Sequence, residues 1–195
     1  MKWLLFLPQL PAASSTARVA RWRQLRASGA TKALQGAWVL PDAAEARNAF
    51  ERLADSTLKS GGTAAVFECE AVHGIADEEL VARFRADRER EYQEFATKVA
   101  DFFAEVDKET RLNKFDFAEL EEIEDDLSRL VAWFEKIRSR DHFPDQQLDQ
   151  AGSLLGKCEA ACRAFADRVY QSEDAESSES LPDTDDAPVV DGPGK

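Results

Sequence analysis

Four arginines and a tryptophan crowd into a short, acid-free stretch near the beginning of the chain. The stretch reads TARVARWRQLRASGA over residues 16–30. Guanidinium groups bind phosphate oxygens through paired N–H donors, and an aromatic ring offers a face on which a nucleic-acid base can stack. These residue types at this spacing predict a surface that binds a polyanion. The candidate DNA-binding residues are Arg18, Arg21, Arg23 and Arg26, with Trp22 between them and Lys32 added on charge alone.

The net charge of the whole chain has the opposite sign, at -13. A strongly acidic protein repels DNA unless its charges are segregated along the chain. Here they are segregated. Residues 1–74 carry nine Lys and Arg against six Asp and Glu, residues 75–172 carry 15 against 24, and residues 173–195 carry one against eight. The positive excess is therefore local to the part of the chain that holds the arginines.

A helix over the arginine stretch would not gather the four arginines on one clean face. At 100° per residue, Trp22 shares a side with Val19 and Leu25, and the arginines bracket that side. If Trp22 packs on a sheet, the arginines extend from the two flanks of the helix. If the opposite, alanine-rich side packs, Trp22 and all four arginines are displayed together. Tryptophan is highly buried on average, so we favour the first orientation.

The elements that must position this helix are strands. Apolar runs with strand character occur at residues 2–11, 31–41 and 63–72, and the middle run is divided by a glycine at its turn. A second helix is predicted before the last run and ends at the Gly61–Gly62 pair. The order β–α–β–β–α–β predicts a small ferredoxin-like α+β sandwich over residues 1–74, with both helices on one face of the sheet.

Beyond residue 74 the hydrophobic period is helical throughout. Three apolar stripes predict a three-helix antiparallel region over residues 75–171, packed like a coiled coil. Cys158 and Cys162 occupy stripe positions one turn apart, so we interpret them as core residues rather than as a redox or metal pair. Residues 172–195 are acidic and rich in Pro, Ser and Gly, a composition that predicts a disordered tail.

One position of the first helical stripe is not apolar. Arg88 follows Phe84 and precedes Tyr92 in the stripe, so its side chain must pair with an acid, stack on Tyr92 or face another surface. Pairing with an acid is the favoured interpretation. Because an arginine in an apolar stripe is unusual, Arg88 and Tyr92 are kept with Trp22 as possible functional residues.

Residue patterns typical of catalysis are missing from the sequence. It has no Walker-type loop, no cysteine and histidine set at zinc-ligand spacing, and no nucleophile beside a base. We therefore expect a protein that is not an enzyme and uses no cofactor or metal. The apolar run before Pro8 is short for a signal peptide, nothing approaches a membrane span, and three cysteines fit a reducing compartment. The expected location is the cytoplasm, with no membrane partner.

Several segments resemble the amino-terminal domain of the chromate-resistance regulators called ChrB. They are KWLLFLPQLP, RVARWRQLRASGATKALQGAWVLPD, ARFRADREREY and IRSRDHF, and the resemblance runs over residues 1–170. It implies a transcriptional regulator that binds operator DNA upstream of a chromate transporter gene, with Arg18, Arg21, Arg23 and Arg26 as candidate DNA contacts.

The first 75 residues are also similar to small CRISPR-associated adaptation nucleases. In those nucleases the first strand ends in a metal-binding aspartate, whereas this chain has Pro8, Gln9, Leu10 and Pro11 there. The nuclease chemistry is therefore not carried over by the resemblance.

Two functions from different classes follow. The leading hypothesis is a DNA-binding transcriptional regulator, acting as a homodimer or with a separately encoded partner domain. Regulators of the family that this chain resembles continue into a second domain, whereas this sequence ends in an acidic stretch. The alternative is therefore a non-catalytic protein-interaction or accessory module that acts through its helical region.

Overall fold

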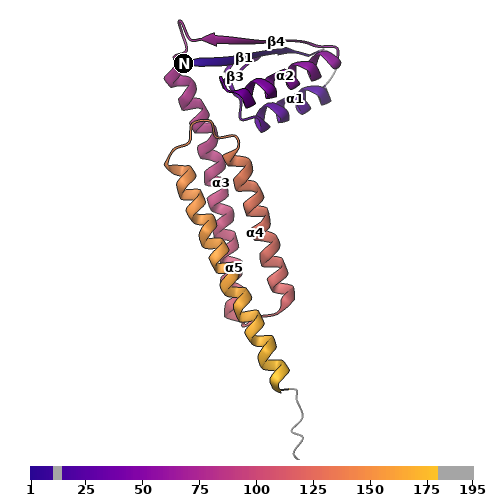
Figure 1. Ribbon diagram of the computed structural model, residues 1–195, viewed down its shortest axis with the longest axis vertical. Helices are drawn as coiled ribbons and strands as arrows, with labels where there is room; N and C mark the ends of the chain where they lie inside the picture. Colours follow the sequence, from indigo (N-terminus) through magenta and orange to yellow (C-terminus); the bar gives the residue numbers. More distant parts are fainter. Residues whose placement is uncertain (11–14, 180–195) are drawn as a thin grey trace, which may run out of the picture.

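The computed structural model describes residues 1–10 and 15–179 of the chain. It is an α+β structure, as predicted, with a four-stranded antiparallel sheet and two helices followed by three long helices. We call the first part the head and the last three helices the stalk, and Figure 1 shows the head at one end of the elongated stalk. The elements are β1 (Lys2–Gln9), α1 (Ser15–Ala27), β2 (Thr31–Leu34), β3 (Ala37–Pro41), α2 (Ala44–Lys59), β4 (Thr63–Glu70), α3 (Asp77–Leu112), α4 (Phe117–Arg138) and α5 (Gln146–Glu179).

The sheet has the strand order β2-β3-β1-β4, and its neighbouring strands are antiparallel. Strand β1 lies inside the sheet, where both of its faces can be covered. On one face Phe6 packs against Phe50 of α2, with 5.2 Å between ring centroids. On the other face Trp3 stacks on Phe84 of α3, at 5.9 Å. Helices α1 and α2 lie side by side along the sheet (Figure 1), and the start of α3 packs against the Trp3 side of β1 through Phe84.

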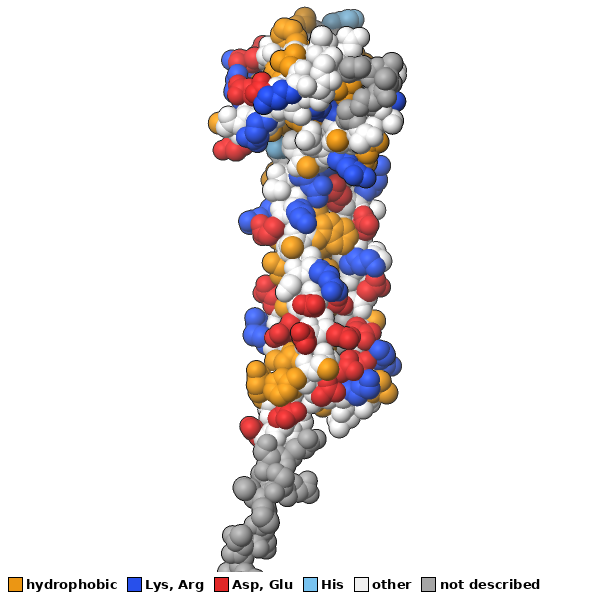
Figure 2. Space-filling view, turned by 90° about the vertical axis from the view of Figure 1, so that its right-hand side faces the viewer, with side chains coloured by type: hydrophobic (Ala, Val, Ile, Leu, Met, Phe, Trp, Pro, Cys, Tyr) orange, Lys and Arg blue, Asp and Glu red, His pale blue; other side chains and the backbone are white. Residues whose placement is uncertain are grey.

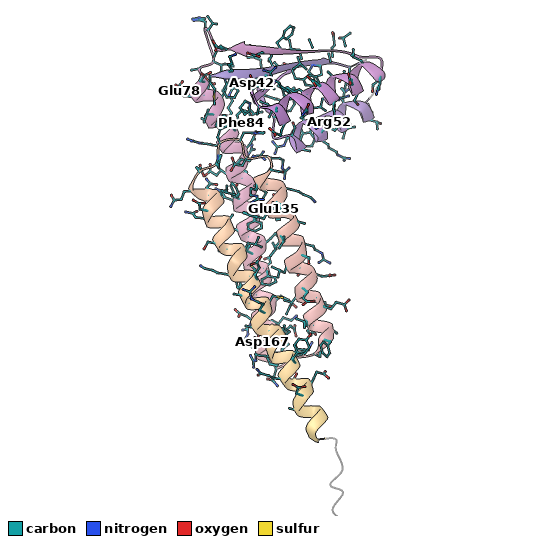
Figure 3. All side chains as sticks on the ribbon, in the orientation of Figure 1. Asp42, Arg52, Glu78, Phe84, Glu135 and Asp167 are labelled. Atoms are coloured by element: carbon teal, nitrogen blue, oxygen red, sulfur yellow. The ribbon has the colours of Figure 1, made fainter. Side chains whose placement is uncertain are left out.

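Helix α3 belongs to both parts of the molecule. Its first turns contribute Leu80 and Phe84 to the core of the head, and from Tyr92 onward its buried residues join the core of the stalk. Figure 3 labels Phe84 on α3 close to the head. Arg88 lies between these two cores, so the interrupted stripe of the sequence marks the position where one core ends and the other begins.

The end of α1 also contacts the stalk. Gly29 has φ +75°, and a Cβ at this residue would lie 2.5 Å from the Arg140 carbonyl oxygen in the α4–α5 connection. A side chain would therefore meet both backbone strain and a steric clash. In the same place the His142 Nε2 atom lies 3.0 Å from the Ser28 carbonyl oxygen. These contacts place α1 directly beside the stalk.

The stalk core follows the three predicted stripes. Cys158 and Cys162 are buried free thiols within it, as predicted. The prediction was wrong in part at the tail, because α5 continues to Glu179 instead of ending before residue 172. The rest of the predicted tail, residues 180–195, lies outside the described residues. Within the described ranges, no helix has the length and apolar character needed to cross a membrane.

Candidate functional site

Helix α1 packs against the head through neither of the two sides predicted from the sequence, the Trp22 side and the alanine-rich side. Trp22 is 51% exposed, so the expected burial of its ring was wrong. The alanine-rich side does not pack either, since Ala20 and Gln24 are exposed. Instead Arg21 and Leu25, one turn apart, are buried. The prediction from the 100° helical spacing was wrong because it treated every arginine as a surface residue. A long arginine side chain can also lie along a packed face.

Arg21 connects α1 to α2. Its guanidinium donates through Nη1 to the Leu53 carbonyl oxygen at 2.6 Å and through Nη2 to the Ser56 hydroxyl at 3.2 Å. Burial lowers the pKa of Arg21, and its Nε has no hydrogen-bond partner in the described part of the chain. The predicted role of Arg21 as a phosphate ligand therefore conflicts with its position, because its charged group is used inside the head.

A cationic hollow lies where α1, the β2–β3 hairpin and α3 meet. Its volume is about 360 Å³. We call it the junction cleft. It is lined by four cations, one carboxylate, two tryptophans, a threonine and an alanine, which are Arg26, Lys32, Arg83, Arg90, Asp87, Trp22, Trp38, Thr31 and Ala86.

Asp87 is the anion around which the cleft is organised. Its side chain is 18% exposed and lies 3.4 Å from an Arg26 guanidinium nitrogen. It also accepts hydrogen bonds from Arg90 and, at 3.2 Å, from the Thr31 hydroxyl. One carboxylate thus orients two arginines from different helices. Arg90 is 71% exposed on its side chain, so its free N–H groups remain open to a second anion.

The other two cations of the cleft come from opposite walls. The Lys32 ammonium lies 5.3 Å from the centroid of the Trp38 ring, its cross-strand neighbour, and covers one side of that ring. Arg83 donates to the Lys32 and Ala33 carbonyl oxygens at 2.9 and 2.7 Å and also pairs with Glu79. Arg83 therefore ties α3 to the edge strand β2, while the Lys32 charge is held on an aromatic face rather than by an acid.

Behind the cleft a second acid holds three arginines. Glu91 lies 3.1 Å from Arg88, 3.4 Å from Arg140 and 3.5 Å from Arg26, measured between side-chain oxygen and nitrogen atoms. Arg88 is 5% exposed, and burial lowers the pKa of its guanidinium. The pairing favoured for Arg88 is therefore confirmed. Because Arg26 reaches both Asp87 and Glu91, the cleft is linked to this buried network.

Tyr92, the other residue singled out beside Arg88, has its own partner. Its hydroxyl donates to Asp141 at 2.8 Å, and burial together with this hydrogen bond raises the pKa of the phenol. The ring belongs to the stalk core. Tyr92 thus joins α3 to the α4–α5 connection and lies outside the lining of the cleft.

The structure brings some predicted site residues together and separates others. Trp22, Arg26 and Lys32 line the cleft, whereas Arg18 and Arg23 are exposed on α1 outside its lining. Sequence reasoning missed Arg83 and Arg90 as partners of this site. The signal was present, because positions 83, 86, 87 and 90 follow a helical 3–4 spacing and so share one face of α3.

The charge around the cleft contrasts with the rest of the stalk. Figure 2 shows Lys and Arg side chains gathered where the stalk meets the head and Asp and Glu side chains gathered toward its far end. A larger groove of about 580 Å³ between α3 and α4 is lined by five acids and two bases around an apolar floor. Among the described residues, no group of three or more His, Cys, Asp or Glu could hold a metal ion.

Comparison with known proteins gives two consistent matches. Residues 18–176 match the family described as "Protein ChrB, N-terminal". The protein named "Protein ChrB" from Cupriavidus metallidurans (strain ATCC 43123 / DSM 2839 / NBRC 102507 / CH34) is 31% identical over 146 residues. That match covers 74% of this chain and 41% of the relative, so the chain spans less than half the length of the curated protein it matches. The α1 arginines and the whole junction cleft fall inside the matched range, and the chain belongs to the ChrB amino-terminal domain family.

Proposed function

We propose that the chain is a DNA-binding transcriptional regulator of the chromate-resistance type. The observation that carries the proposal is the junction cleft, a concentration of four cations around one carboxylate in a chain of net charge -13. A local positive surface of this kind is what phosphate binding requires of an acidic protein. The membership in the ChrB family supports the regulatory role, and such a regulator would act in the cytoplasm, without catalysis, as a homodimer or with a partner domain.

The phosphate contacts of this proposal differ from those predicted by sequence. Arg18, Arg23 and Arg26 are retained on α1, Lys32 is retained on β2, and Arg83 and Arg90 of α3 are added. Arg21 is removed because its guanidinium is buried against α2. Backbone phosphates of one DNA strand would run across the cleft from the exposed side of α1 to α3. Contacts of this type position a protein on DNA without reading the base sequence.

The proposal includes a finer description of the architecture. The strand order β2-β3-β1-β4 with α1 and α2 on one face supports a ferredoxin-like head. The continuous core shared by α3, α4 and α5 supports a three-helix antiparallel stalk. In this arrangement the head presents α1, and the stalk supplies the second wall of the phosphate site through α3.

A salt-titrated mobility shift on the DNA upstream of the gene tests the proposal. We expect binding whose logarithm falls steeply with the logarithm of salt concentration, by about 0.9 for each phosphate neutralised on duplex DNA. Arg23→Ala and Arg90→Ala should each weaken binding and lower this slope by roughly one phosphate. Arg163→Ala, which removes the same charge from an exposed position of α5, is the matched control and should leave the slope unchanged.

Two outcomes would contradict the DNA-binding proposal. One is the lack of any shift at low salt. The other is an equal loss of affinity in the cleft variants and in Arg163→Ala, which would mean that only the net charge matters.

The second candidate function is a protein-interaction module that acts through the stalk. The groove between α3 and α4 favours it, because Phe102, Ile123, Leu130 and Trp133 form an apolar floor between acidic walls. A basic amphipathic segment of another protein would suit such a groove. Recovery of one stoichiometric partner protein in a pull-down, without DNA, would support this function over the first.

A further inference from the structure

No packing contact among the described residues requires a tryptophan at position 22. Trp22 lines the junction cleft and is half-exposed, whereas Trp3 and Trp38 are buried in the head. Within the described chain its ring stacks on no other ring and has no cation over it. A tryptophan is highly buried on average, and an exposed large apolar ring costs solvation. An open aromatic face beside a cationic hollow is the arrangement that single-stranded nucleic-acid binders use for a base.

The cations of the cleft line the same hollow as this ring. Arg26 follows Trp22 by one helical turn, and Arg90 reaches in from α3 with a side chain that is 71% exposed. The Lys32 ammonium has an aromatic partner but no acidic one among the described residues. A phosphate entering the cleft would therefore meet guanidinium and ammonium donors. It would compete with Asp87 for Arg26 and Arg90, and with Glu91 for Arg26.

The size of the cleft limits the ligand. A volume of about 360 Å³ is near the lower end of the range for small-molecule sites, about 300–1,000 Å³. An inorganic tetrahedral anion would occupy the cations and leave the ring unused. A paired base inside a duplex cannot reach the ring, since its faces are covered by its neighbours in the stack. A nucleotide unit with an unpaired base uses both the cations and the ring.

We propose that the junction cleft binds one nucleotide unit, with its phosphate held by Arg26, Lys32 and Arg90 and its base stacked on the exposed face of Trp22. The inference deepens the proposed function and rests on it for the source of the nucleotide, which is a DNA strand with an unstacked base. A free nucleotide offers the same chemistry and is separated from a strand by the test. The predicted stacking tolerates any base, because each base has a π-face.

Tryptophan fluorescence and affinity of four probes test this inference. The probes are a single strand of about ten thymidines, a mixed-sequence duplex of equal length, thymidine monophosphate and inorganic phosphate, each at the same ionic strength. We expect the single strand to quench the fluorescence of the wild-type protein. Trp22→Ala should remove this quenching and weaken single-strand binding roughly 5- to 150-fold, the effect of losing one base–aromatic stack. Trp22→Phe, which keeps a ring, should retain most of the affinity, and Trp133→Phe in the stalk should retain the quenching.

The outcomes separate this inference from the proposed function. Monophosphate binding as tight as the single strand supports the inference with a free nucleotide as the source, and much tighter strand binding identifies a strand. Binding of inorganic phosphate as tightly as the monophosphate overturns it, as does unchanged strand affinity in Trp22→Ala. Duplex binding with a steep salt slope and no quenching by the strand leaves the proposed function standing and the inference refuted. Strand binding with quenching but without duplex binding supports the inference and contradicts the proposed binding of duplex DNA.

Discussion

The head covers a sheet with elements from distant parts of the chain, whereas the stalk repeats one kind of contact along three helices. In the head, Trp3 of β1 meets Phe84 of α3 and Phe143 of the α4–α5 connection. In the stalk, apolar residues every three or four positions meet equivalent residues on neighbouring helices. The head core therefore depends on residues far apart in sequence, and the stalk core follows a local period.

The two regions also place their charges differently. Stalk charges lie mainly on exposed faces, where many form pairs three or four residues apart, such as Lys98 with Asp101 and Arg129 with Asp126. Such exposed pairs contribute little stability. At the junction, by contrast, Asp87 and Glu91 are shielded and each holds more than one arginine. The difference shows that the charges that position a site are the ones between the regions, not the more numerous ones along the stalk.

The largest expected effect tests the dependence of the head on α3. Phe84→Ala removes a ring that is 2% exposed and packs against Trp3, so we expect a loss of about 3–5 kcal/mol in the free energy of unfolding. Urea unfolding followed by tryptophan fluorescence and by helical circular dichroism measures it. Phe117→Ala, at a 49% exposed position of the stalk, is the control and should cost clearly less. Equal losses would mean that the head core does not depend on α3.

The next effect concerns the buried charges between the regions. Glu91→Gln leaves Arg26, Arg88 and Arg140 close together without their shared carboxylate, and we expect a loss of about 2–4 kcal/mol. Arg88→Met keeps the length of the side chain, and Glu91 retains two arginines, so its loss should stay below about 1.5 kcal/mol. Urea midpoints of the two variants give the comparison. A larger loss for Arg88→Met than for Glu91→Gln would show that the arginine, not the acid, organises the junction.

The sequence predicted the stalk better than the head, and the reason is physical. A helical period is a local signal, so the stripes and the two cysteines could be assigned to a core without knowing their partners. The order of strands and helices in the head was also readable from apolar runs and glycines. The side of α1 that packs against the head could not be predicted from the sequence, because it depends on the hydrogen bond from Arg21 to the Leu53 carbonyl oxygen of another helix.

The candidate site shows the same limit. Trp22, Arg26 and Lys32 were found because they stand close together in the chain. Arg83 and Arg90 join them only through the packing of α3 beside β2, with Thr31 and Asp87 in contact. A periodic face on α3 could be recognised from sequence, but no local pattern indicates which other element that face meets.

A smaller effect distinguishes the arginines of α1. Arg21→Met removes two hydrogen bonds between α1 and α2, so we expect a loss of about 1–2 kcal/mol in the free energy of unfolding. The same change at exposed Arg23 should stay within about 0.5 kcal/mol. Thermal or urea unfolding of both variants decides between them. Equal stability of the two variants would mean that Arg21 does not join α1 to α2 and is again a candidate phosphate ligand.

The smallest effect is a pH dependence that arises at one edge of the sheet in the head. Hydrogen bonds from Lys2 and Arg47, each 2.6 Å long, lower the pKa of Glu68 from 4.5 to about 2. A lowered carboxyl pKa contributes stability above the unfolded value, and the contribution is lost as pH falls through the folded value. The stability difference between wild type and Glu68→Gln should therefore be full above about pH 4.5 and shrink toward pH 2. Urea midpoints across this range measure it, with Glu51→Gln on the exposed side of α2 as the control. A difference that stays constant with pH would mean that the Lys2–Glu68–Arg47 contacts, although close, do not stabilise the edge of the sheet.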